Sequence, residues 1–173
     1  MNILLVGNAA REHAIAEAIL RSKHKPKLFS YMKARNPGIA KLSADVSIGA
    51  YDNLEEIKNF AKANAIEFAV VGPEDPLSKG VVDALEEVGI KSVGPKKELA
   101  RLETSKSFTR LLGKKYNIEG CPKFQVFESL EGVRDFITEL HPEIVIKPDG
   151  LTGGKGVRVQ GDHFQTEEEA YQY

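Results

Sequence analysis

Short runs of β-branched and other apolar residues alternate with helix-length segments, and this alternation constrains the fold more than any other feature. We expect strands at residues 2–6, 27–31, 45–48, 67–71 and 91–93, and helices at residues 11–21, 53–64 and 77–88. Strands separated by helix-length segments are joined by crossovers, which make the strands parallel and place helices on the faces of the sheet. The sequence therefore predicts an α/β fold with a parallel sheet. In the first helix, the residues expected to face inward are Ala14, Ile15, Ala18 and Ile19.

The spacing changes after Pro95, where a second unit is expected. Helices are expected at residues 96–101, 105–116 and 130–140, and strands at residues 124–127, 143–147 and 157–160. The strand-helix-strand order of residues 124–147 predicts a second βαβ unit. Thr166, followed by glutamates, has the pattern of a capped helix start, yet the chain stops at Tyr173, about two turns later. We therefore expect one domain at residues 1–102 and a truncated second domain at residues 103–173.

The charges nearly cancel, since 24 basic and 25 acidic residues give a formal net charge of -1. Non-specific binding to nucleic acid or to an anionic membrane has no global electrostatic support, so any anion site must be local. Cys121 is the only cysteine, which excludes an intrachain disulfide and a cysteine-clustered zinc site. The apolar run at residues 1–7 is too short for a membrane span or a signal-peptide core. The chain is therefore predicted to be cytoplasmic.

A glycine turn that leads into a helix follows the first strand. Free N–H groups and the helix dipole make such a turn an anion site. The dinucleotide-binding fingerprint that begins at Gly7 fails, because Ala9 and Glu12 occupy its second and third glycine positions. Arg11 in the first helical turn opposes the dipole unless it meets an anion. The loop therefore predicts a site for a phosphate monoester, with a generic strand-to-helix turn as the alternative.

Two further loops are expected at the same sheet edge, because they follow other parallel strands. In the loop after residue 71, Asp75 fits as a helix N-cap with Pro76 at the first helical position. That assignment leaves Glu74 unexplained, and a rigidly held carboxylate there is suited to accept hydrogen bonds from sugar hydroxyls. Residues 36–38 form the other loop, which alone is only a turn.

The glycine-rich segment at residues 144–157 carries the strongest local signal. Strand alternation places Lys147 on the face opposite Ile144, and a lysine in so apolar a strand is costly unless its charge meets an anion. Four glycines within residues 150–156 predict a hairpin loop whose N–H groups close over phosphates. It is not a Walker P-loop, because Gly156 stands where Ser or Thr is required. A flexible hairpin with a solvated lysine is the alternative.

Four motifs in this order resemble those of the glycinamide ribonucleotide synthetase (phosphoribosylamine–glycine ligase) family of ATP-grasp enzymes. They are GNAAREHA at residues 7–14, VGPEDPLSKGVVD at 71–83, LETSKSFT at 102–109 and IVIKPDGLTGGKGV at 144–157. The resemblance covers nearly all of this chain but only the front part of the family's length. It implies a Rossmann-like N-terminal (pre-ATP-grasp) domain that binds the phosphoribosyl substrate, followed by the beginning of an ATP-grasp domain.

The resemblance also implies roles for individual residues. Those expected to bind the phosphoribosyl substrate are Gly7, Asn8, Arg11, Glu12, Asn36, Gly38, Pro73 and Glu74. Within this group, Gly7, Asn8 and Arg11 would hold the phosphate. Glu74 would hold the ribose hydroxyls. Those expected to bind ATP are Lys106, Lys147, Gly150, Gly153, Gly154, Lys155 and Gly156, with residues 150–156 as a flap.

The implied reaction has two steps. ATP phosphorylates the carboxylate of glycine, and the amine of phosphoribosylamine attacks the acyl phosphate, which gives glycinamide ribonucleotide, ADP and phosphate. The ligands of Mg²⁺ or Mn²⁺ and the glycine site are expected beyond Tyr173, so no metal ligand is expected here and the chain alone is expected to be inactive. Such an enzyme of purine biosynthesis acts on small molecules, without nucleic acid or membrane partners.

The chain departs from the family pattern in two loops. Ala9 and Ala10 stand where the family often has glycines, and residues 36–40 replace a Pro-Gly-Asn-Ala-Gly loop. Two other interpretations stay open: an ATP-grasp ligase or carboxylase that uses a different acid, and a non-catalytic module that binds sugar phosphates. A nicotinamide-dependent oxidoreductase is disfavoured by the failed dinucleotide fingerprint.

Overall fold

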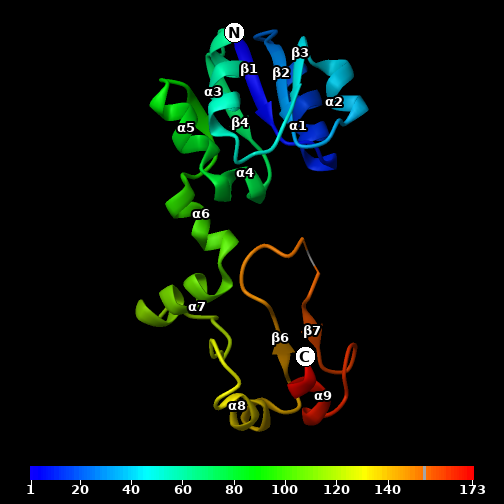
Figure 1. Cartoon of the computed structure of the whole chain (residues 1–173), viewed down its shortest axis with the longest axis vertical. Coiled ribbons are helices and arrows are strands. Elements are labelled where there is room, and N and C mark those ends of the chain that lie inside the picture. Colours follow the sequence, from blue (N-terminus) through cyan, green and yellow to red (C-terminus); the bar gives the residue numbers. More distant parts are fainter. Residues whose placement is uncertain (154) are drawn as a thin grey trace. The chain divides into compact units, whose positions relative to one another are not determined.

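The computed structural model describes residues 1–153 and 155–173, which form two compact units, Met1–Arg101 and Leu102–Tyr173 (Figure 1). The first unit contains a sheet of five parallel strands: β1 (Asn2–Val6), β2 (Lys27–Met32), β3 (Asp45–Ile48), β4 (Phe68–Val71) and β5 (Lys91–Val93). The strand order is β3-β2-β1-β4-β5, so β1 lies in the centre. The predicted parallel α/β fold is confirmed.

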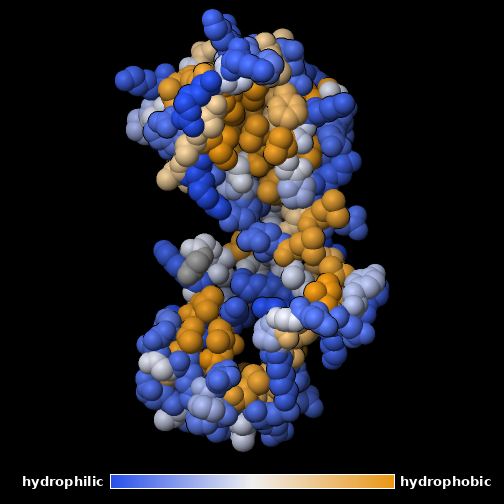
Figure 2. Space-filling view, turned by 180° about the vertical axis from the view of Figure 1, so that it is seen from behind, coloured by the Kyte–Doolittle hydropathy of each residue, from blue (hydrophilic) through white to orange (hydrophobic). Residues whose placement is uncertain are grey.

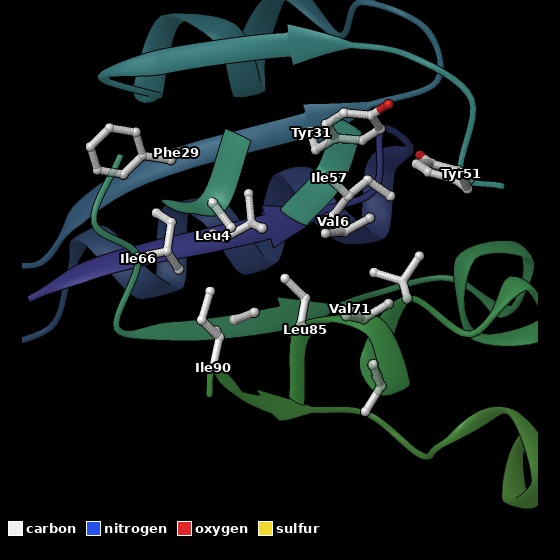
Figure 3. Close-up of a cluster of buried hydrophobic side chains, with 14 residues drawn as sticks. Leu4, Val6, Phe29, Tyr31, Tyr51, Ile57, Ile66, Val71, Leu85 and Ile90 are labelled. Atoms are coloured by element: carbon white, nitrogen blue, oxygen red, sulfur yellow. The ribbon is translucent and has the colours of Figure 1, made fainter. Parts of the chain in front are cut away.

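Helices cover both faces of this sheet (Figure 1). One face packs against α1 (Ala10–Leu20) and α2 (Pro37–Leu42), and the other against α3 (Leu54–Ala63) and α5 (Val81–Glu87). Successive side chains of a strand point to opposite faces. Leu4 and Val6 of β1 therefore enter the cluster on the α3/α5 face, which Figure 3 shows, while Leu5 enters the cluster on the α1/α2 face. All three side chains are fully buried, which makes β1 the common centre of both cores.

The helix predicted at residues 77–88 is in fact two helices. The first, α4 (Glu74–Lys79), ends at Gly80, whose left-handed conformation (φ 88°) separates it from α5. The N-cap of α4 is Pro73, so the prediction of Asp75 as N-cap is wrong. Asp75 instead lies in the first turn, where its negative charge complements the helix dipole.

A helix that was not predicted, α2, follows Asn36, where only a turn was expected. The Asn36 Oδ1 accepts hydrogen bonds from the N–H groups of Gly38 (2.9 Å) and Ile39 (3.2 Å), and Pro37 occupies the first helical turn. This arrangement of N-cap and proline is favourable for starting a helix. The helix is only six residues long, too short to show the periodicity that identifies longer helices.

The inward face of α1 also differs from the prediction. Ala14 and Ala18 are exposed, whereas Glu12 and Ala16 are buried. The hydrophobic pattern places a glutamate on the solvent side of a helix. With Glu12 assigned to solvent, the predicted inward face was displaced around the helix from the observed one. The predicted inward positions of Ile15 and Ile19 are confirmed, because both pack against the cluster on the α1/α2 face.

The second unit contains one short hairpin. Strands β6 (Val145–Ile146) and β7 (Arg158–Val159) pair antiparallel, which confirms the predicted hairpin. The helices after β5 are α6 (Lys97–Thr104), α7 (Lys106–Lys115), α8 (Val133–Leu140) and α9 (Glu167–Gln172). Thr166 caps α9 by accepting a hydrogen bond from the Glu169 N–H (3.2 Å), as predicted. The strand predicted at residues 124–127 is wrong, and so is the second βαβ unit, because this segment is irregular and pairs with no strand among the described residues.

The second unit has a small core. Its buried cluster consists of Ile137, Ile144, Phe164 and Ala170. Large apolar side chains that stay exposed in this unit include Leu111, Tyr116, Ile118, Val126, Leu130 and Val145. Figure 2 shows hydrophobic residues, in orange, on the surface of the chain. In the part of the chain that the structure describes, no helix is long and apolar enough to cross a membrane.

Candidate functional site

The candidate substrate site lies at the carboxyl edge of the first sheet, where the strand order reverses. The chain runs from β1 outward to β2 and β3 and then continues with β4 on the other side of β1. In parallel α/β sheets, ligands bind in the crevice outside the carboxyl ends of the strands at such a point. The Gly72 N–H donates to the Val6 carbonyl (3.0 Å), and the Gly7 N–H donates to the Tyr31 carbonyl (3.1 Å). These bonds keep the ends of β4, β1 and β2 together where their loops begin.

Glu12 lies beneath the loops that follow β1 and β4, and its exposed fraction is only 1%. Its Oε2 accepts a hydrogen bond from the Ala9 N–H (2.7 Å), while its Oε1 has no hydrogen-bond partner among the described residues. A Cβ on Gly7 or on Gly72 would stand 2.3 or 2.6 Å from the Glu12 Cγ. Both glycines therefore make room for Glu12, which supports the loop after β1 from below.

Arg11 and Glu74 meet at this edge from α1 and α4. The Arg11 Nη2 lies 3.2 and 3.1 Å from the two carboxylate oxygens of Glu74. A hydrogen bond from its own backbone N–H lowers the pKa of Glu74 most, partial burial opposes this, and Arg11 lowers the pKa further. The Arg11 side chain is 70% exposed and the Glu74 side chain 34%. An ion pair this open contributes only about 0–1 kcal/mol, so a ligand can rearrange it at little cost.

A second ion pair lies at the same edge, between Lys33 and Asp75. The Lys33 Nζ, just after β2, is 3.2 Å from the Asp75 Oδ2. Lys33 was not among the predicted site residues, because a lysine after a strand is usually a surface residue. The sequence feature that indicates a role for Lys33 at the site is its position directly after a parallel strand. Together with Arg11 and Glu74, this pair forms a local charge pattern that the net charge of -1 does not reveal.

Asn8 is held on two sides. The Asn36 Nδ2 donates to the Asn8 carbonyl (3.0 Å), and the Tyr51 hydroxyl donates to the Asn8 Oδ1 (2.7 Å). Because the Asn36 Oδ1 already caps α2, Asn36 ties α2 to the loop after β1. Tyr51 was not among the predicted site residues, since a buried tyrosine after a strand resembles an ordinary core residue. A Cβ on Gly38 would stand 2.2 Å from the His13 ring, so this glycine makes room for the histidine.

In the second unit, Asp149 binds the N-terminus of α7. Its carboxylate accepts hydrogen bonds from the N–H groups of Lys106 (2.7 Å) and Ser107 (3.2 Å) and from the hydroxyls of Ser105 and Ser107. The Ser107 hydroxyl is the largest of the causes that hold the pKa of Asp149 well below its usual range. The Lys106 Nζ donates to the Gly150 carbonyl (2.6 Å). The structure thus brings Lys106 to the beginning of the glycine-rich loop.

Lys106 and Lys147 line a cavity of about 880 Å³ within the second unit. Its apolar walls include Val126, Leu130 and Phe136. Lys147 is exposed, so its charge is not buried. The expectation that its position in an apolar strand is costly without an anion is therefore wrong. The prediction that Lys147 lies on the strand face opposite Ile144 is confirmed, because Ile144 is 3% exposed and belongs to the core.

The glycine-rich loop joins β6 to β7. Its described glycines have positive φ: Gly150 (82°), Gly153 (59°) and Gly156 (85°). Such conformations favour glycine. Lys155 is exposed, and its N–H donates to the Thr152 carbonyl (3.0 Å). Gly154 lies outside the described residues, and among those described no group of His, Cys, Asp and Glu side chains is arranged to hold a metal ion.

The chain matches two family profiles. The profile of the phosphoribosylglycinamide synthetase N domain matches residues 1–103, and that of the ATP-grasp (A) domain matches residues 104–173. The phosphoribosylamine–glycine ligase of Methanosarcina barkeri is 51% identical over 164 residues, 95% of this chain and 38% of the relative. That of Methanocaldococcus jannaschii is 49% identical over 177 residues, 100% of this chain and 40% of the relative. The chain thus spans about 40% of the length of these relatives.

Solved structures with low sequence identity share the fold. An ADP complex of N5-carboxyaminoimidazole ribonucleotide synthetase has a TM-score of 0.77 at 16% identity, over 99% of this chain and 43% of the other. The phosphoribosylglycinamide synthetase of Anaerococcus prevotii has a TM-score of 0.62 at 16% identity, over 99% of this chain and 40% of the other. The fold is therefore an α/β domain followed by part of an ATP-grasp region. Because the two family profiles together account for every residue, this chain belongs to the phosphoribosylglycinamide synthetase family.

Proposed function

We propose that this chain is the front part of a phosphoribosylamine–glycine ligase, whose first unit binds the phosphoribosyl group and whose second unit begins the ATP site. The observation that carries the proposal is the carboxyl edge of the first sheet. There the N-terminus of α1, the amide of Asn8 and the pair of Arg11 and Glu74 lie around the loops after β1 and β4. Donors for a phosphate thus lie beside an acceptor for hydroxyl groups, which suits a sugar phosphate.

Within this site we assign the phosphate to the first turn of α1. The Ala9 N–H already donates to the Glu12 carboxylate (2.7 Å), so the next N–H group of the first helical turn, that of Ala10, is the backbone donor that we assign to the phosphate. The guanidinium of Arg11 adds a charged donor, and Glu74 accepts from the ribose hydroxyls. The remaining residues of the predicted set shape these loops: Gly7, Glu12, Asn36, Gly38 and Pro73.

The cavity of the second unit suits ATP. Its apolar walls fit an adenine ring, and the ammonium groups of Lys106 and Lys147 fit phosphates. Residues 150–156 would close over these phosphates, as a flap that excludes water from a reactive acyl phosphate. Bound ATP supplies the phosphoryl group that activates the glycine carboxylate for attack by the amine, with release of ADP and phosphate. We expect the ligands of Mg²⁺ or Mn²⁺ and the glycine site in the part of the ligase that this chain does not span, and we expect the enzyme to work in the cytoplasm.

The test is a hybrid in which this chain replaces the matching part of the Methanosarcina barkeri ligase. ADP release is measured with ATP, Mg²⁺, glycine and freshly generated phosphoribosylamine, and again with formate or bicarbonate instead of glycine. We expect ADP release that depends on both glycine and phosphoribosylamine from the hybrid, and none from the 173-residue chain alone.

The parent Methanosarcina barkeri ligase is the control for the assay. A folded hybrid without turnover, beside an active parent, would contradict the ligase assignment, and ribose 5-phosphate binding by that hybrid would then favour a non-catalytic sugar-phosphate-binding module. Turnover by the isolated chain would contradict the expectation that the chain alone is inactive.

A further inference from the structure

Tyr51 is a buried tyrosine at the candidate substrate site to which the proposed function gives no role. It follows β3, is 4% exposed and belongs to the cluster on the α3/α5 face. Its ring lies next to that of Tyr31, with centroids 6.5 Å apart, and Figure 3 shows the two tyrosines as neighbours. Its hydroxyl, however, does not stay within the apolar cluster. It donates a hydrogen bond to the Asn8 Oδ1 at 2.7 Å, in the loop after β1.

The hydroxyl of Tyr51 stays protonated at neutral pH and can therefore donate a hydrogen bond. Burial raises the pKa of Tyr51 most, a hydrogen bond from the backbone of Lys33 lowers it, and the carboxylates of Glu12 and Asp75 raise it further. Because the oxygen already accepts from the backbone of Lys33, its proton is directed to the other polar neighbour, Asn8. A neutral tyrosine thus bridges the segments that follow β1, β2 and β3.

This bond determines which end of the Asn8 amide is available to a ligand. In a carboxamide, the oxygen only accepts and the nitrogen only donates, so fixing the position of one atom fixes the other. Asn8 Oδ1 is held by Tyr51, whereas Asn8 Nδ2 has no hydrogen-bond partner among the described residues. Asn8 is also partly exposed, so its NH₂ group is available at the sheet edge.

We infer that Tyr51 is a positioning residue that fixes Asn8 as a hydrogen-bond donor toward an oxygen-rich ligand. Resting on the proposed function, this inference identifies that ligand as the phosphate or hydroxyl oxygens of the phosphoribosyl group. Without the Tyr51 hydroxyl, the Asn8 amide can turn by half a rotation and present Oδ1, which repels phosphate oxygens and cannot donate to a hydroxyl oxygen. Tyr51 therefore determines the orientation of Asn8 before the ligand arrives, a form of preorganisation.

The matched comparison is between Tyr51→Phe and Tyr31→Phe. Both changes remove one hydroxyl from the same cluster, but the Tyr31 hydroxyl donates to the Ala50 carbonyl (3.3 Å) and not to Asn8. Binding of ribose 5-phosphate to the 173-residue chain is measured by calorimetry, with thermal unfolding of each variant as a check on folding. Tyr51→Phe should raise the Kd about fivefold, the effect of one lost hydrogen bond, and Tyr31→Phe should leave it unchanged.

Asn8→Ala tests whether Tyr51 acts through Asn8. In a chain that already carries Asn8→Ala, adding Tyr51→Phe should not weaken binding further, because the group that Tyr51 orients is gone. A purely structural contribution of Tyr51 would persist in that background. The side-chain NH₂ resonance of Asn8 gives a reading that needs no ligand, since Tyr51→Phe should make this group more mobile in the free chain.

The outcomes separate this inference from the proposed function. If the wild-type chain binds ribose 5-phosphate and folded Tyr51→Phe binds it equally well, Tyr51 does not position Asn8, while the proposed function stands. If Tyr51→Phe weakens binding equally with and without Asn8→Ala, the inference is also overturned. Absence of binding by the wild-type chain overturns the proposed function, and with it the role of Tyr51 toward a ligand.

Discussion

Glu12 shows how one buried side chain determines the shape of a loop. Burying a carboxylate is costly unless it is hydrogen-bonded, and only one of its oxygens has a partner among the described residues. The carboxylate nevertheless connects the start of α1 to the ends of two strands, because it occupies the space that side chains at positions 7 and 72 would fill. The two glycines and Glu12 thus depend on one another.

We predict that Gly72→Ala destabilises the first unit by about 1–3 kcal/mol, the usual cost of overpacking. Its Cβ would stand 2.6 Å from the buried Glu12 Cγ, which has little room to move. Urea denaturation followed by tyrosine fluorescence measures the change. The control is Gly72→Ala in a chain that already carries Glu12→Ala, where the Cγ that the new Cβ would meet is absent. An equal cost of Gly72→Ala in both backgrounds would show that Glu12 does not restrict position 72.

We also predict that Arg11→Met weakens ribose 5-phosphate binding about 10- to 100-fold, the effect of losing a hydrogen bond between charged groups. Arg11→Lys should recover only part of the affinity, because an ammonium group lacks the planar fork of the guanidinium. Calorimetric titration at fixed salt measures both. The control is Arg21→Met, which changes an exposed arginine at the other end of α1. Unaltered binding by Arg11→Met would remove Arg11 from the site.

At the scale of single residues, the sequence was informative where a residue conflicted with its expected surroundings. Arg11 stands at a helix start and Glu74 beside an N-cap pattern, so both were predicted to bind a ligand, and the structure brings them within hydrogen-bond distance. Tyr51 and Lys33 gave no such conflict, so only the three-dimensional arrangement relates them to the same edge. Burial of Glu12 was not predictable from periodicity, because the pattern assigns glutamate to the solvent.

The N-terminus of α7 is the element where the second unit depends most on one charge. The free N–H groups of a helix start attract an anion, and here the chain itself supplies the carboxylate of Asp149. Through the contact of Lys106 with the Gly150 carbonyl, the same helix start also holds the beginning of the glycine-rich loop. A nucleotide phosphate that attracts Lys106 would therefore loosen the loop at its first residue.

We predict that Asp149→Asn destabilises the second unit by about 1 kcal/mol at pH 7, a loss comparable to that of a helix cap. A carboxyl whose folded-state pKa lies below its unfolded value stabilises the fold at pH above the unfolded value, about 3.9 for Asp. That contribution is lost as the pH falls through the folded-state pKa. The difference between wild type and variant should therefore shrink as the pH is lowered below about 4. Thermal unfolding at pH 7 and at pH 3 measures it.

The control for this prediction is Asp162→Asn. The Asp162 side chain is exposed, and its carboxylate makes no hydrogen bond or ion pair with the described residues. Its replacement should change stability little at either pH. A difference between wild type and Asp149→Asn that grows on acidification has the wrong sign for a carboxyl with a lowered pKa and would overturn this account of α7.

Among the secondary-structure elements, the sequence predicted best those with strong periodicity or clear caps. The strands of the first sheet and α3 were predicted within a residue or so of their observed bounds, because buried β-branched runs between helical segments leave little ambiguity. The break at Gly80 was missed because a single glycine within an apolar helical pattern is often tolerated. The strand predicted at residues 124–127 failed because a strand requires a partner, which local sequence does not specify.

For the molecule as a whole, the two units differ in how much apolar surface they bury. The first has a five-stranded sheet with a hydrophobic cluster on each face, whereas the second has two-residue strands and one small cluster. Burial of one large apolar side chain contributes about 1.5–3 kcal/mol, so we expect the first unit to be the more stable of the two. The change in element spacing after Pro95 predicts a second unit, and the domain boundary after residue 102 stays a prediction.

We predict that backbone amides of β1, β2 and β4 exchange with deuterium at least about 100-fold more slowly than those of β6 and β7, because their opening requires unfolding of the larger core. Hydrogen exchange followed by NMR at neutral pH measures this ratio. Amides of α3, which packs on the same sheet, serve as the internal reference for the first unit. Equal protection of both units would indicate that they unfold as one cooperative body.

The central claim is that the carboxyl edge of the first sheet binds the phosphoribosyl group. The most direct measurement is an NMR titration of the ¹⁵N-labelled 173-residue chain with ribose 5-phosphate, with ribose and inorganic phosphate as separate controls. The account predicts saturable shifts at Asn8, Arg11 and Glu74, with tighter binding of the sugar phosphate than of either component. Absence of saturable shifts at this edge, or shifts confined to residues 150–156, would contradict it.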